Sequence, residues 1–260
     1  MKRKELLIII PAYNEEDNIG AFLEKLEAPE IMEKADILVM NDASGDRTGD
    51  IVRARGHEVI DHVYNLGYGC GLWVGYKYAV KKGYQYVIQM DADGQHDVCN
   101  VLKLYRRLKG EDGQGGYFPD IVLGSRFVEG SMAYPTTRMK KIAYALFRRL
   151  IRMGTGRKIM DPTTGLQGLS RRAFSYYAGF GHFDDKYPDA NMIMQMLMLG
   201  FGVEEVPAVM HARTNGTSMH SGILKPLQYM FRMTFSIVAV WIRVRLFRVN
   251  KGIVDNGAAT

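Results

Sequence analysis

The chain has few of the features that mark disulfide-stabilised, zinc-binding or membrane-spanning proteins. Its 260 residues include only two cysteines, Cys70 and Cys99, and they form no C-x-x-C pair. This argues against a disulfide scaffold or a zinc ribbon and favours a reducing cytosol. No stretch reaches the roughly 18 consecutive apolar residues that a membrane-spanning helix needs. The sequence also has no internal repeat and no low-complexity linker.

The amino terminus lacks the pattern of a signal peptide. Basic residues precede an apolar run, Leu6–Ile10, but the run is short and leads into the polar segment Asn14–Asp17 without a small-residue cleavage site. Such a run is typical of a buried strand.

The composition indicates a folded domain with an anionic partner. Hydrophobic residues make up 47% of the chain and charged residues 24%, which suffices for a core. Lys and Arg number 34 against 28 Asp and Glu, a net charge of +6. This excess suits nucleic acid, nucleotide phosphates or an anionic membrane surface. The positive charges lie on amphipathic segments without interleaved stacking aromatics, which argues against nucleic acid.

The first half of the chain alternates predicted strands with predicted helices. Strands are expected at Leu6–Ile10, Ile37–Met40, Val59–Ile60, Tyr86–Met90 and Ile121–Leu123. The helices between them are one N-capped by Asn14, one over Asp46–Arg55, one from the glycine-rich Leu66–Gly71 to Gly83, and one over Val98–Leu108. Repeated strand–helix units of this length predict an α/β fold, with a doubly wound, mostly parallel sheet and flanking helices.

The second half has two long segments that are both basic and apolar. Arg138–Met153 is predicted to be an amphipathic helix, with Met139, Ile142, Ala143, Leu146, Leu150 and Met153 on its apolar face. In Leu224–Arg248 the residues Arg232, Ser236 and Arg243 form a narrow polar stripe, as in a helix lying in the plane of a membrane surface. Between them, Asp161–Gly168 is expected to be a polar loop.

Polar segments follow three of the predicted strands: Pro11–Glu15, Asn41–Asp46 and Asp91–His96. In an open parallel sheet, ligands bind beyond the carboxyl ends of the strands, so the three segments should converge on one site. Asp91 and Asp93 can share a hard divalent cation there. A lone Asp-x-Asp is more often a solvated loop with a helix cap, and the two accompanying segments reverse that balance.

Together these segments resemble family 2 glycosyltransferases of the GT-A fold, and most of all the polyprenyl-phosphate sugar transferases. The matching segments are Ile10–Glu16, Asn41–Thr48, Asn65–Gly69, Asp91–His96, Gly124–Phe127, Asp161–Gly165 and Arg213–Ser218. The chain departs from the family pattern at two turns. Ala43 replaces a usual glycine, and Asp97 replaces the proline that usually follows Gln-His.

The resemblance implies a role for each matching residue. Nucleotide-sugar binding is implied for Pro11, Tyr13, Glu15, Asp42, Asp91, Ala92, Asp93 and Arg213. Arg126 and Arg138 would bind the acceptor phosphate, and Asp93 with Gln95 would hold Mg²⁺ or Mn²⁺. The implied catalytic set is Asp91, Asp93, Arg126 and Asp161, with Asp161 facing the sugar.

The implied reaction is metal-dependent transfer of a sugar, with inversion, from a nucleotide-diphosphate sugar to a polyprenyl phosphate such as undecaprenyl phosphate. A UDP-sugar is the favoured donor, and cell-surface glycan assembly is the implied purpose. A lipid phosphate is already ionised at neutral pH and needs no general base. The alternative within the family is transfer to a saccharide hydroxyl. That reaction needs a carboxylate base, for which Asp184, Asp185 and Asp189 lie in a suitable region.

The acceptor implies a location, because the phosphate of such a lipid lies at the leaflet surface. We expect the chain to be cytoplasmic and peripheral on the inner face of the cell membrane. Residues 1–222 would form the GT-A catalytic domain, including the basic helix over residues 138–153. Residues 223–248 would form an interfacial helix that contacts anionic lipid, a small membrane protein or a second copy of the chain. Residues 249–260 would be a flexible tail.

Two groups outside the motifs receive structural interpretations. His57 and His62 are predicted to be surface residues, because neither has an acidic partner in register. Met192, Met194, Met196 and Met198 are predicted to fill the core from a helix that ends at Gly200.

Overall fold

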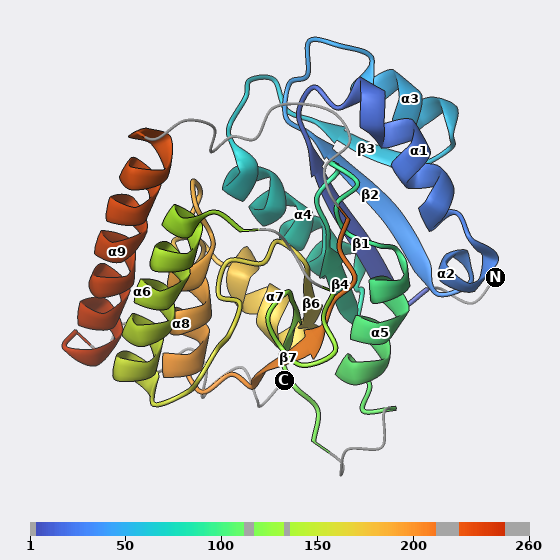
Figure 1. Ribbon diagram of the computed structural model, residues 1–260. Coiled ribbons are helices and arrows are strands. Elements are labelled where there is room, and N and C mark those ends of the chain that lie inside the picture. Colours follow the sequence, from blue (N-terminus) through green and yellow to red (C-terminus); the bar gives the residue numbers. More distant parts are fainter. Residues whose placement is uncertain (1–3, 112–116, 133–135, 212–223, 248–260) are drawn as a thin grey trace.

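A computed structural model describes residues 4–111, 117–132, 136–211 and 224–247 (Figure 1). In these residues one seven-stranded sheet has the order β3-β2-β1-β4-β6-β5-β7. Its strands are β1 (Leu6–Ala12), β2 (Ala35–Asn41), β3 (Glu58–Asp61), β4 (Tyr86–Gln89), β5 (Ile121–Ser125), β6 (Gln167–Ser170) and β7 (Val203–Pro207). The predicted α/β fold with a mostly parallel sheet is confirmed.

Strand β1 lies in the middle of the parallel part of the sheet. It pairs in parallel with β2 on one side and β4 on the other. Successive side chains of a strand point to opposite faces, and β1 supplies both core clusters accordingly. Leu7 and Ile9 enter one cluster, while Leu6, Ile8 and Ile10 enter the other. A strand covered on both faces explains why the run is continuously apolar.

Helices cover both faces of this sheet (Figure 1). Helices α1 (Glu16–Leu26), α2 (Pro29–Met32), α3 (Thr48–Ala54) and α5 (Cys99–Leu108) contribute buried residues to the cluster that contains Ile8. Helices α4 (Tyr68–Lys82), α7 (Arg171–Ala178), α6 (Arg138–Thr155), α8 (Ala190–Met198) and α9 (Leu224–Arg245) contribute to the cluster that contains Leu7. The chain therefore forms a layered domain with the sheet at its centre.

Strand β6 was not predicted, and it is the one antiparallel member of the described sheet. It pairs antiparallel with both β4 and β5. It begins at Gln167, inside the segment Asp161–Gly168 that was predicted to be a loop. A Cβ added to Gly168 would lie 3.0 Å from Leu108 Cδ1 of α5, so the close packing of this helix leaves little room for a side chain at this position of the strand. The polar loop therefore ends at Leu166.

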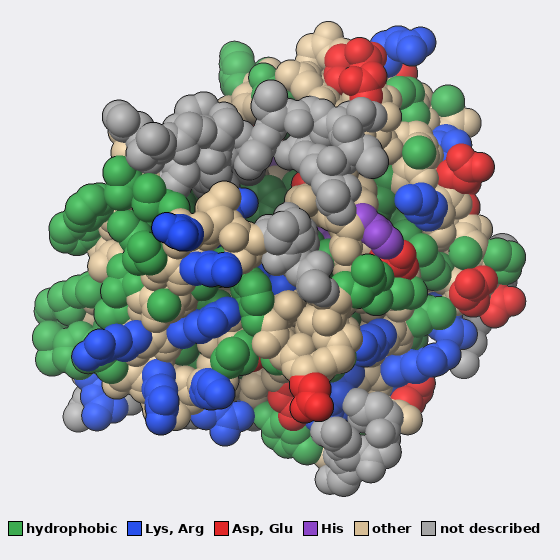
Figure 2. Space-filling view, in the orientation of Figure 1, with side chains coloured by type: hydrophobic (Ala, Val, Ile, Leu, Met, Phe, Trp, Pro, Cys, Tyr) green, Lys and Arg blue, Asp and Glu red, His purple; other side chains and the backbone are tan. Residues whose placement is uncertain are grey.

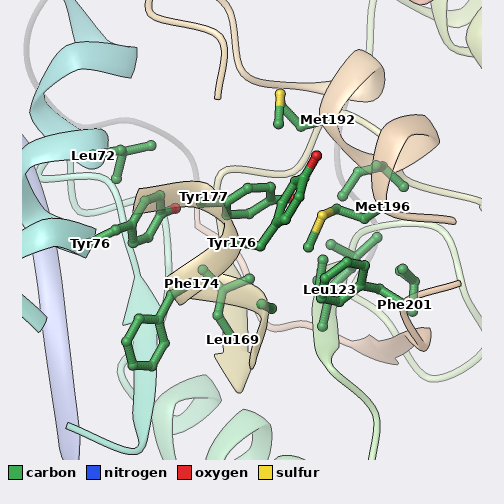
Figure 3. Close-up of a cluster of buried hydrophobic side chains, with 14 of the residues drawn as sticks. Leu72, Tyr76, Leu123, Leu169, Phe174, Tyr176, Tyr177, Met192, Met196 and Phe201 are labelled. Atoms are coloured by element: carbon green, nitrogen blue, oxygen red, sulfur yellow. The ribbon is translucent and has the colours of Figure 1, made fainter. Parts of the chain in front are cut away.

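The methionine helix was predicted correctly. Met192, Met194 and Met196 are buried in α8, and Gly200 follows the helix with a φ of +83°. Figure 3 shows Met192 and Met196 next to the aromatic side chains Tyr176 and Tyr177. Unbranched methionine side chains adapt to the irregular space that aromatic rings leave in a core.

The apolar face predicted for α6 is rotated from the one observed. The helix buries Ala143, Tyr144, Phe147 and Ile151, whereas the predicted face members Ile142 and Met153 are 61% and 73% exposed. The rings of Tyr144 and Phe147 bury more apolar area than aliphatic side chains do, so the face of the helix that carries them packs against the core.

Helix α9 packs against α6 and α8, and its inner face belongs to the core (Figure 1). Met233, Ile237, Val240 and Val244 are buried there. Two members of the predicted polar stripe turn inward, since Ser236 Oγ accepts a hydrogen bond from Asn191 and Arg243 donates to Gln195, while Arg232 is exposed. The proposed boundary after residue 222 falls outside the described residues and stays a prediction. Within the described part of the chain, no helix is long and apolar enough to cross a membrane.

Candidate active site

The three polar segments that follow β1, β2 and β4 lie at one edge of the sheet. The strands are neighbours and parallel, so their carboxyl ends meet there. The first two segments are joined by hydrogen bonds. Asn14 Oδ1 accepts from the Gly45 amide at 2.9 Å, and Ser44 Oγ accepts from the Asn14 amide at 3.0 Å. The predicted convergence of the motifs on one site is confirmed.

The N-cap predicted for Asn14 is wrong. Helix α1 begins at Glu16 with Glu15 as its cap residue, and Asn14 adopts a left-handed φ of 52°. The leading amides of Glu15 and Glu16 are instead satisfied across the site, by Thr48 Oγ1 and Asp46 Oδ2. A capping partner that lies 30 or more residues away along the chain cannot be found from local sequence.

Ala43 also adopts the left-handed conformation, with a φ of 58°. This is the position at which family 2 members usually carry glycine. A side chain with a Cβ costs about 1–2 kcal/mol there, so the departure has a backbone cost while the turn is kept.

Asp42 holds the glycine-rich segment that leads into α4. It is 6% exposed, and its carboxylate accepts from His62 Nδ1 and from the amides of Leu66 and Gly67, each at 2.8 Å. This carboxylate therefore fixes the segment before α4, while Tyr13, which follows β1, is half exposed. Glu15 accepts from Asn18 Nδ2 at 2.7 Å, and Pro11 lies within β1.

The surface interpretation of the two histidines is wrong. The side chains of His62 and His57 are only 5% and 7% exposed, and both have acidic partners, Asp42 and Glu27. Together with Arg55, His57 lowers the pKa of Glu27 to about 2, with the Arg55 hydrogen bond as the largest cause. Both pairs join residues 20 or more positions apart, and sequence spacing carries no sign of them.

Glycine is required where the segment before α4 meets the loop before α8. A Cβ on Gly69 would lie 2.5 Å from the carbonyl oxygen of Asp184, and the Cys70 amide donates to the carbonyl of Asp185 at 3.1 Å. This contact brings residues of the 184–189 loop to the same edge of the sheet as the strand-end motifs.

Asp91 lies at the centre of the site and is one third exposed. Tyr68 Oη donates to its Oδ1 at 3.0 Å, and His96 Nε2 lies 3.4 Å from its Oδ2. Burial raises the pKa of this carboxyl, but the hydrogen bonds from His96 and Tyr68 and the charges of His96 and Arg126 outweigh it and lower the pKa overall. Asp91 is therefore held as a carboxylate. The buried Ala92 separates it from Asp93.

Asp93 and Gln95 fit the requirements of a magnesium or manganese site. They supply hard oxygen ligands from one tight turn, in which Asp93 Oδ1 accepts from the Gln95 amide at 3.0 Å and Gly94 has a φ of +71°. No group of three or more His, Cys, Asp or Glu residues in the described chain could hold a metal by itself. Mg²⁺ in nucleotide enzymes is commonly bound by one or two carboxylates and completed by substrate phosphates.

Arg126 and Asp161 form a buried ion pair. Arg126 Nε and Nη2 donate to the two carboxylate oxygens at 2.7 and 2.6 Å, and the Arg126 amide donates to Oδ2 at 2.9 Å. Asp161 is fully buried and Arg126 is 11% exposed. Asp161 was expected to face the sugar, and the structure places it beneath Arg126. Its observed contacts orient the arginine.

Glu205 was not anticipated from the sequence. It lies on β7 and accepts from the amides of Met160 and Asp161, both at 2.7 Å. Burial is the largest cause that raises the pKa of Glu205, and the charge of Asp161 adds to it. The residue fixes the backbone that carries Asp161. A glutamate in the middle of a short strand, next to a second glutamate, gave no indication of this role.

Lys140 and Arg148 of α6 lie on the side of the helix that faces Arg126 and Asp161. Burial lowers the pKa of Lys140, and the charge of nearby Arg126 lowers it further. Arg148 Nε donates to the carbonyl of Met160 at 2.6 Å. Arg138 is exposed at the first turn of the same helix. Two cations of α6, Lys140 and Arg148, therefore lie near Arg126.

The segment that leads to Arg213 runs along the Asp91–His96 motif. The His211 amide donates to the carbonyl of Gln95 at 2.8 Å, and His211 Nε2 lies 2.7 Å from Asp97 Oδ2. Burial raises the pKa of Asp97, but hydrogen bonds from Cys99 and His211 bring it down to about 2. Arg213 itself lies outside the described residues.

Comparisons with known proteins agree with this geometry. The model of glycosyl transferase family 2 matches residues 7–177. The chain is 30% identical over 233 residues to the undecaprenyl-phosphate mannosyltransferase of Micrococcus luteus, covering 84% of this chain and 88% of the relative. It is 29% identical over 263 residues to the polyprenol monophosphomannose synthase of Mycolicibacterium smegmatis, covering 95% and 91%.

Solved structures support the fold. The glucosyl-3-phosphoglycerate synthase of Mycobacterium tuberculosis, in complex with Mn²⁺ and UDP-glucose, superposes with a TM-score of 0.62 at 19% identity. The match covers 92% of this chain and 79% of that one. At that identity the likeness establishes a GT-A architecture. Together with the family match over residues 7–177, it shows that this chain belongs to glycosyl transferase family 2 and is a glycosyltransferase.

Proposed function

We propose that the chain transfers a sugar from a nucleotide-diphosphate sugar to a polyprenyl phosphate. The observation that carries this proposal is the Arg126–Asp161 pair beside Asp91. A guanidinium held in place by a buried carboxylate keeps a fixed positive charge at the site, and such a charge suits an anionic phosphate acceptor. The names of the two relatives at about 30% identity support the same acceptor class.

The residues divide the work between two anionic substrates. Asp42, through the Leu66 and Gly67 amides, fixes the loop that borders the nucleoside, and Tyr13 is exposed beside it. Asp93 and Gln95 would hold Mg²⁺ or Mn²⁺, which supplies a Lewis acid for the leaving nucleoside diphosphate.

Arg126 lies near Lys140, and we propose that this pair of cations draws in the acceptor phosphate. An ionised phosphate attacks without loss of a proton, so no general base is needed.

The alternative acceptor, a saccharide hydroxyl, is favoured by one observation. Burial raises the pKa of Asp189 to about 6, with a further contribution from the charge of Asp91. A carboxylate tuned toward neutral pH suits a general base. An acceptor comparison therefore has to be part of the test.

We further propose that the enzyme docks on the cytoplasmic face of the cell membrane through α6 and α9. Figure 2 shows Lys and Arg side chains gathered over α6, next to hydrophobic side chains over α9. The exposed large hydrophobic residues described on α9 are Phe231, Phe235, Val238, Trp241 and Ile242, and the exposed Leu246 and Phe247 follow the helix. The exposed cations of α6 include Lys141, Arg149 and Arg152. Basic charge beside an apolar helix face matches an anionic leaflet.

The test is a screen of nucleotide sugars, including GDP-mannose, UDP-glucose and UDP-GlcNAc, with Mg²⁺ or Mn²⁺. Release of the nucleoside diphosphate is followed with undecaprenyl phosphate, with undecaprenol lacking the phosphate, and with free saccharides as acceptors. Turnover that requires the lipid phosphate supports the proposal. Turnover on saccharides alone refutes it in favour of the hydroxyl acceptor. The sequence favours a UDP-sugar and the names of the relatives favour mannose, so both donor classes are included.

A further inference from the structure

Asp189 belongs to the site but has no part in the proposed transfer to a phosphate. It immediately precedes α8, and Tyr229 Oη of α9 donates to its Oδ2 at 2.7 Å. Among the described residues, Oδ1 receives no hydrogen bond. The side chain is partly exposed. One oxygen is thus anchored while the other is left for a ligand.

The loop that carries Asp189 contacts Gly69 and Cys70 at the start of α4, so it lies at the same edge of the sheet as Asp91, to which Tyr68 donates. Burial raises the pKa of Asp189 to about 6, and the negative charges of Asp91 and Asp184 raise it further. The hydrogen bond from Tyr229 and the positive charge of Arg126 act in the opposite direction. The charge of Asp189 in turn contributes to the raised pKa of Tyr68, the residue bonded to Asp91. Asp189 is therefore close to the carboxylate on the donor side and to the arginine on the acceptor side.

Group transfer fixes what must occupy that position. The sugar moves from the donor diphosphate to the acceptor phosphate, so at the moment of transfer it lies between the groups that bind the two. A carboxylate repels both phosphates, and the hydroxyl groups of the sugar are the donors it can accept from. A polar group that is held without a full set of partners in the free protein is typical of a ligand site.

We propose that Asp189 binds hydroxyl groups of the transferred sugar, and that Tyr229 of α9 positions it for that contact. This proposal rests on the proposed function, since it requires a nucleotide-sugar donor. It assigns to the C-terminal helix a part in donor selection. Asp189 then recognises which sugar is attached to the nucleotide, and the nucleotide itself is bound elsewhere, by the segments after β1, β2 and β4.

Calorimetry on the full chain separates the sugar from the nucleotide. GDP-mannose, UDP-glucose, GDP and UDP are titrated in the presence of Mn²⁺ into wild type and Asp189→Asn. Loss of one charge-assisted hydrogen bond should weaken binding of the preferred nucleotide sugar about tenfold, and leave its nucleoside diphosphate within about twofold.

Tyr229→Phe keeps the ring contacts with Phe147 and Tyr187, and should weaken the same nucleotide sugar by about threefold. Tyr187→Phe is the matched control, because it removes a neighbouring hydroxyl that does not contact Asp189, and it should bind as wild type does.

The other outcomes each overturn a stated part. Equal weakening of nucleotide sugar and nucleoside diphosphate, with a lower melting temperature, would make Asp189 purely structural. Unchanged binding with lost turnover on a saccharide would make it a general base. If Tyr229→Phe behaves as wild type, the positioning by α9 is wrong. If wild type binds neither of these nucleotide sugars and does not bind UDP-GlcNAc, the proposed function falls, and this inference with it.

Discussion

Replacement of Asp161 by asparagine tests the buried ion pair on which the acceptor assignment depends. The change keeps the size of the side chain and removes its charge. Arg126 then retains a guanidinium that is only 11% exposed, opposite an amide in place of the carboxylate that accepted at 2.7 and 2.6 Å. Breaking one half of a buried pair costs about 3–5 kcal/mol, because the remaining charge stays desolvated. Thr163, which also accepts from Nη2 at 3.0 Å, favours the lower end.

The expected loss of about 3 kcal/mol is large enough to measure by urea unfolding. For a domain of this size it corresponds to a fall in melting temperature of about 6–12 °C. Asp50→Asn is the matched control. Asp50 is 81% exposed and lies 3.5 Å from Arg53, so its loss should change stability by less than about 0.5 kcal/mol. A loss below about 1 kcal/mol for Asp161→Asn would show that Arg126 is not held by this pair.

Activity separates orientation from stability. If Asp161 presets Arg126 for phosphate, Asp161→Asn should raise KM for undecaprenyl phosphate and leave donor affinity unchanged. The double variant Arg126→Met, Asp161→Leu removes both charges and should recover part of the stability while activity stays low. Full activity in the double variant would refute the acceptor role of Arg126.

Three further predictions concern the metal, the charge of Asp189 and the membrane. Asp93→Asn should lower turnover at least about 100-fold, which corresponds to about 3 kcal/mol, with little change in melting temperature. Wild type should lose activity in EDTA, and turnover that resists EDTA would contradict the metal assignment. The folded-state pKa of Asp189 is raised from 3.8 to about 6, so ionisation there opposes folding. The unfolding free energy of wild type relative to Asp189→Asn should therefore fall by about 2 kcal/mol as pH rises from 4 to 6, and level off above about pH 7. Urea unfolding at several pH values measures this difference, and a difference that does not change with pH would contradict the prediction. Phe235→Glu, at a side chain 73% exposed on α9, should reduce flotation with anionic liposomes without changing the melting temperature, and Glu24→Gln on α1 should float as wild type does.

The sequence predicted elements whose signal is local. Leu6–Ile10 is a continuous apolar run because β1 is covered on both faces, and such runs are visible without a structure. Gly83 ends α4 in the left-handed conformation, as its position in the pattern predicted. The strand-end motifs converge because parallel neighbours share a carboxyl edge, a consequence of topology once the strands are found.

The parts that escaped prediction depend on contacts between distant residues. Strand β6 is short and contains Gly168, so its sequence lacks the alternation of a strand. His62 is covered because Asp42, 20 residues earlier, needs a donor. The hydrogen bond from Tyr229 to Asp189 spans 40 residues and joins two helices that sequence patterns treat separately. Local spacing contains no information on such pairs.

The same contacts decide what truncation of the C-terminal helix would do. Removal of the chain after Gly222 deletes α9, whose Met233, Ile237, Val240 and Val244 are buried against the domain. Full burial of one such side chain contributes about 1.5–3 kcal/mol, so the four together reach about 6–12 kcal/mol. That equals much of the whole stability of a typical domain, about 5–15 kcal/mol. The truncated chain should therefore melt without a cooperative transition and lose binding to every nucleotide, even though the strand-end motifs remain. A cooperative melt within a few degrees of wild type would show instead that α9 is a detachable anchor. In that case the hydrogen bond from Tyr229 to Asp189 contributes nothing measurable to the stability of the domain.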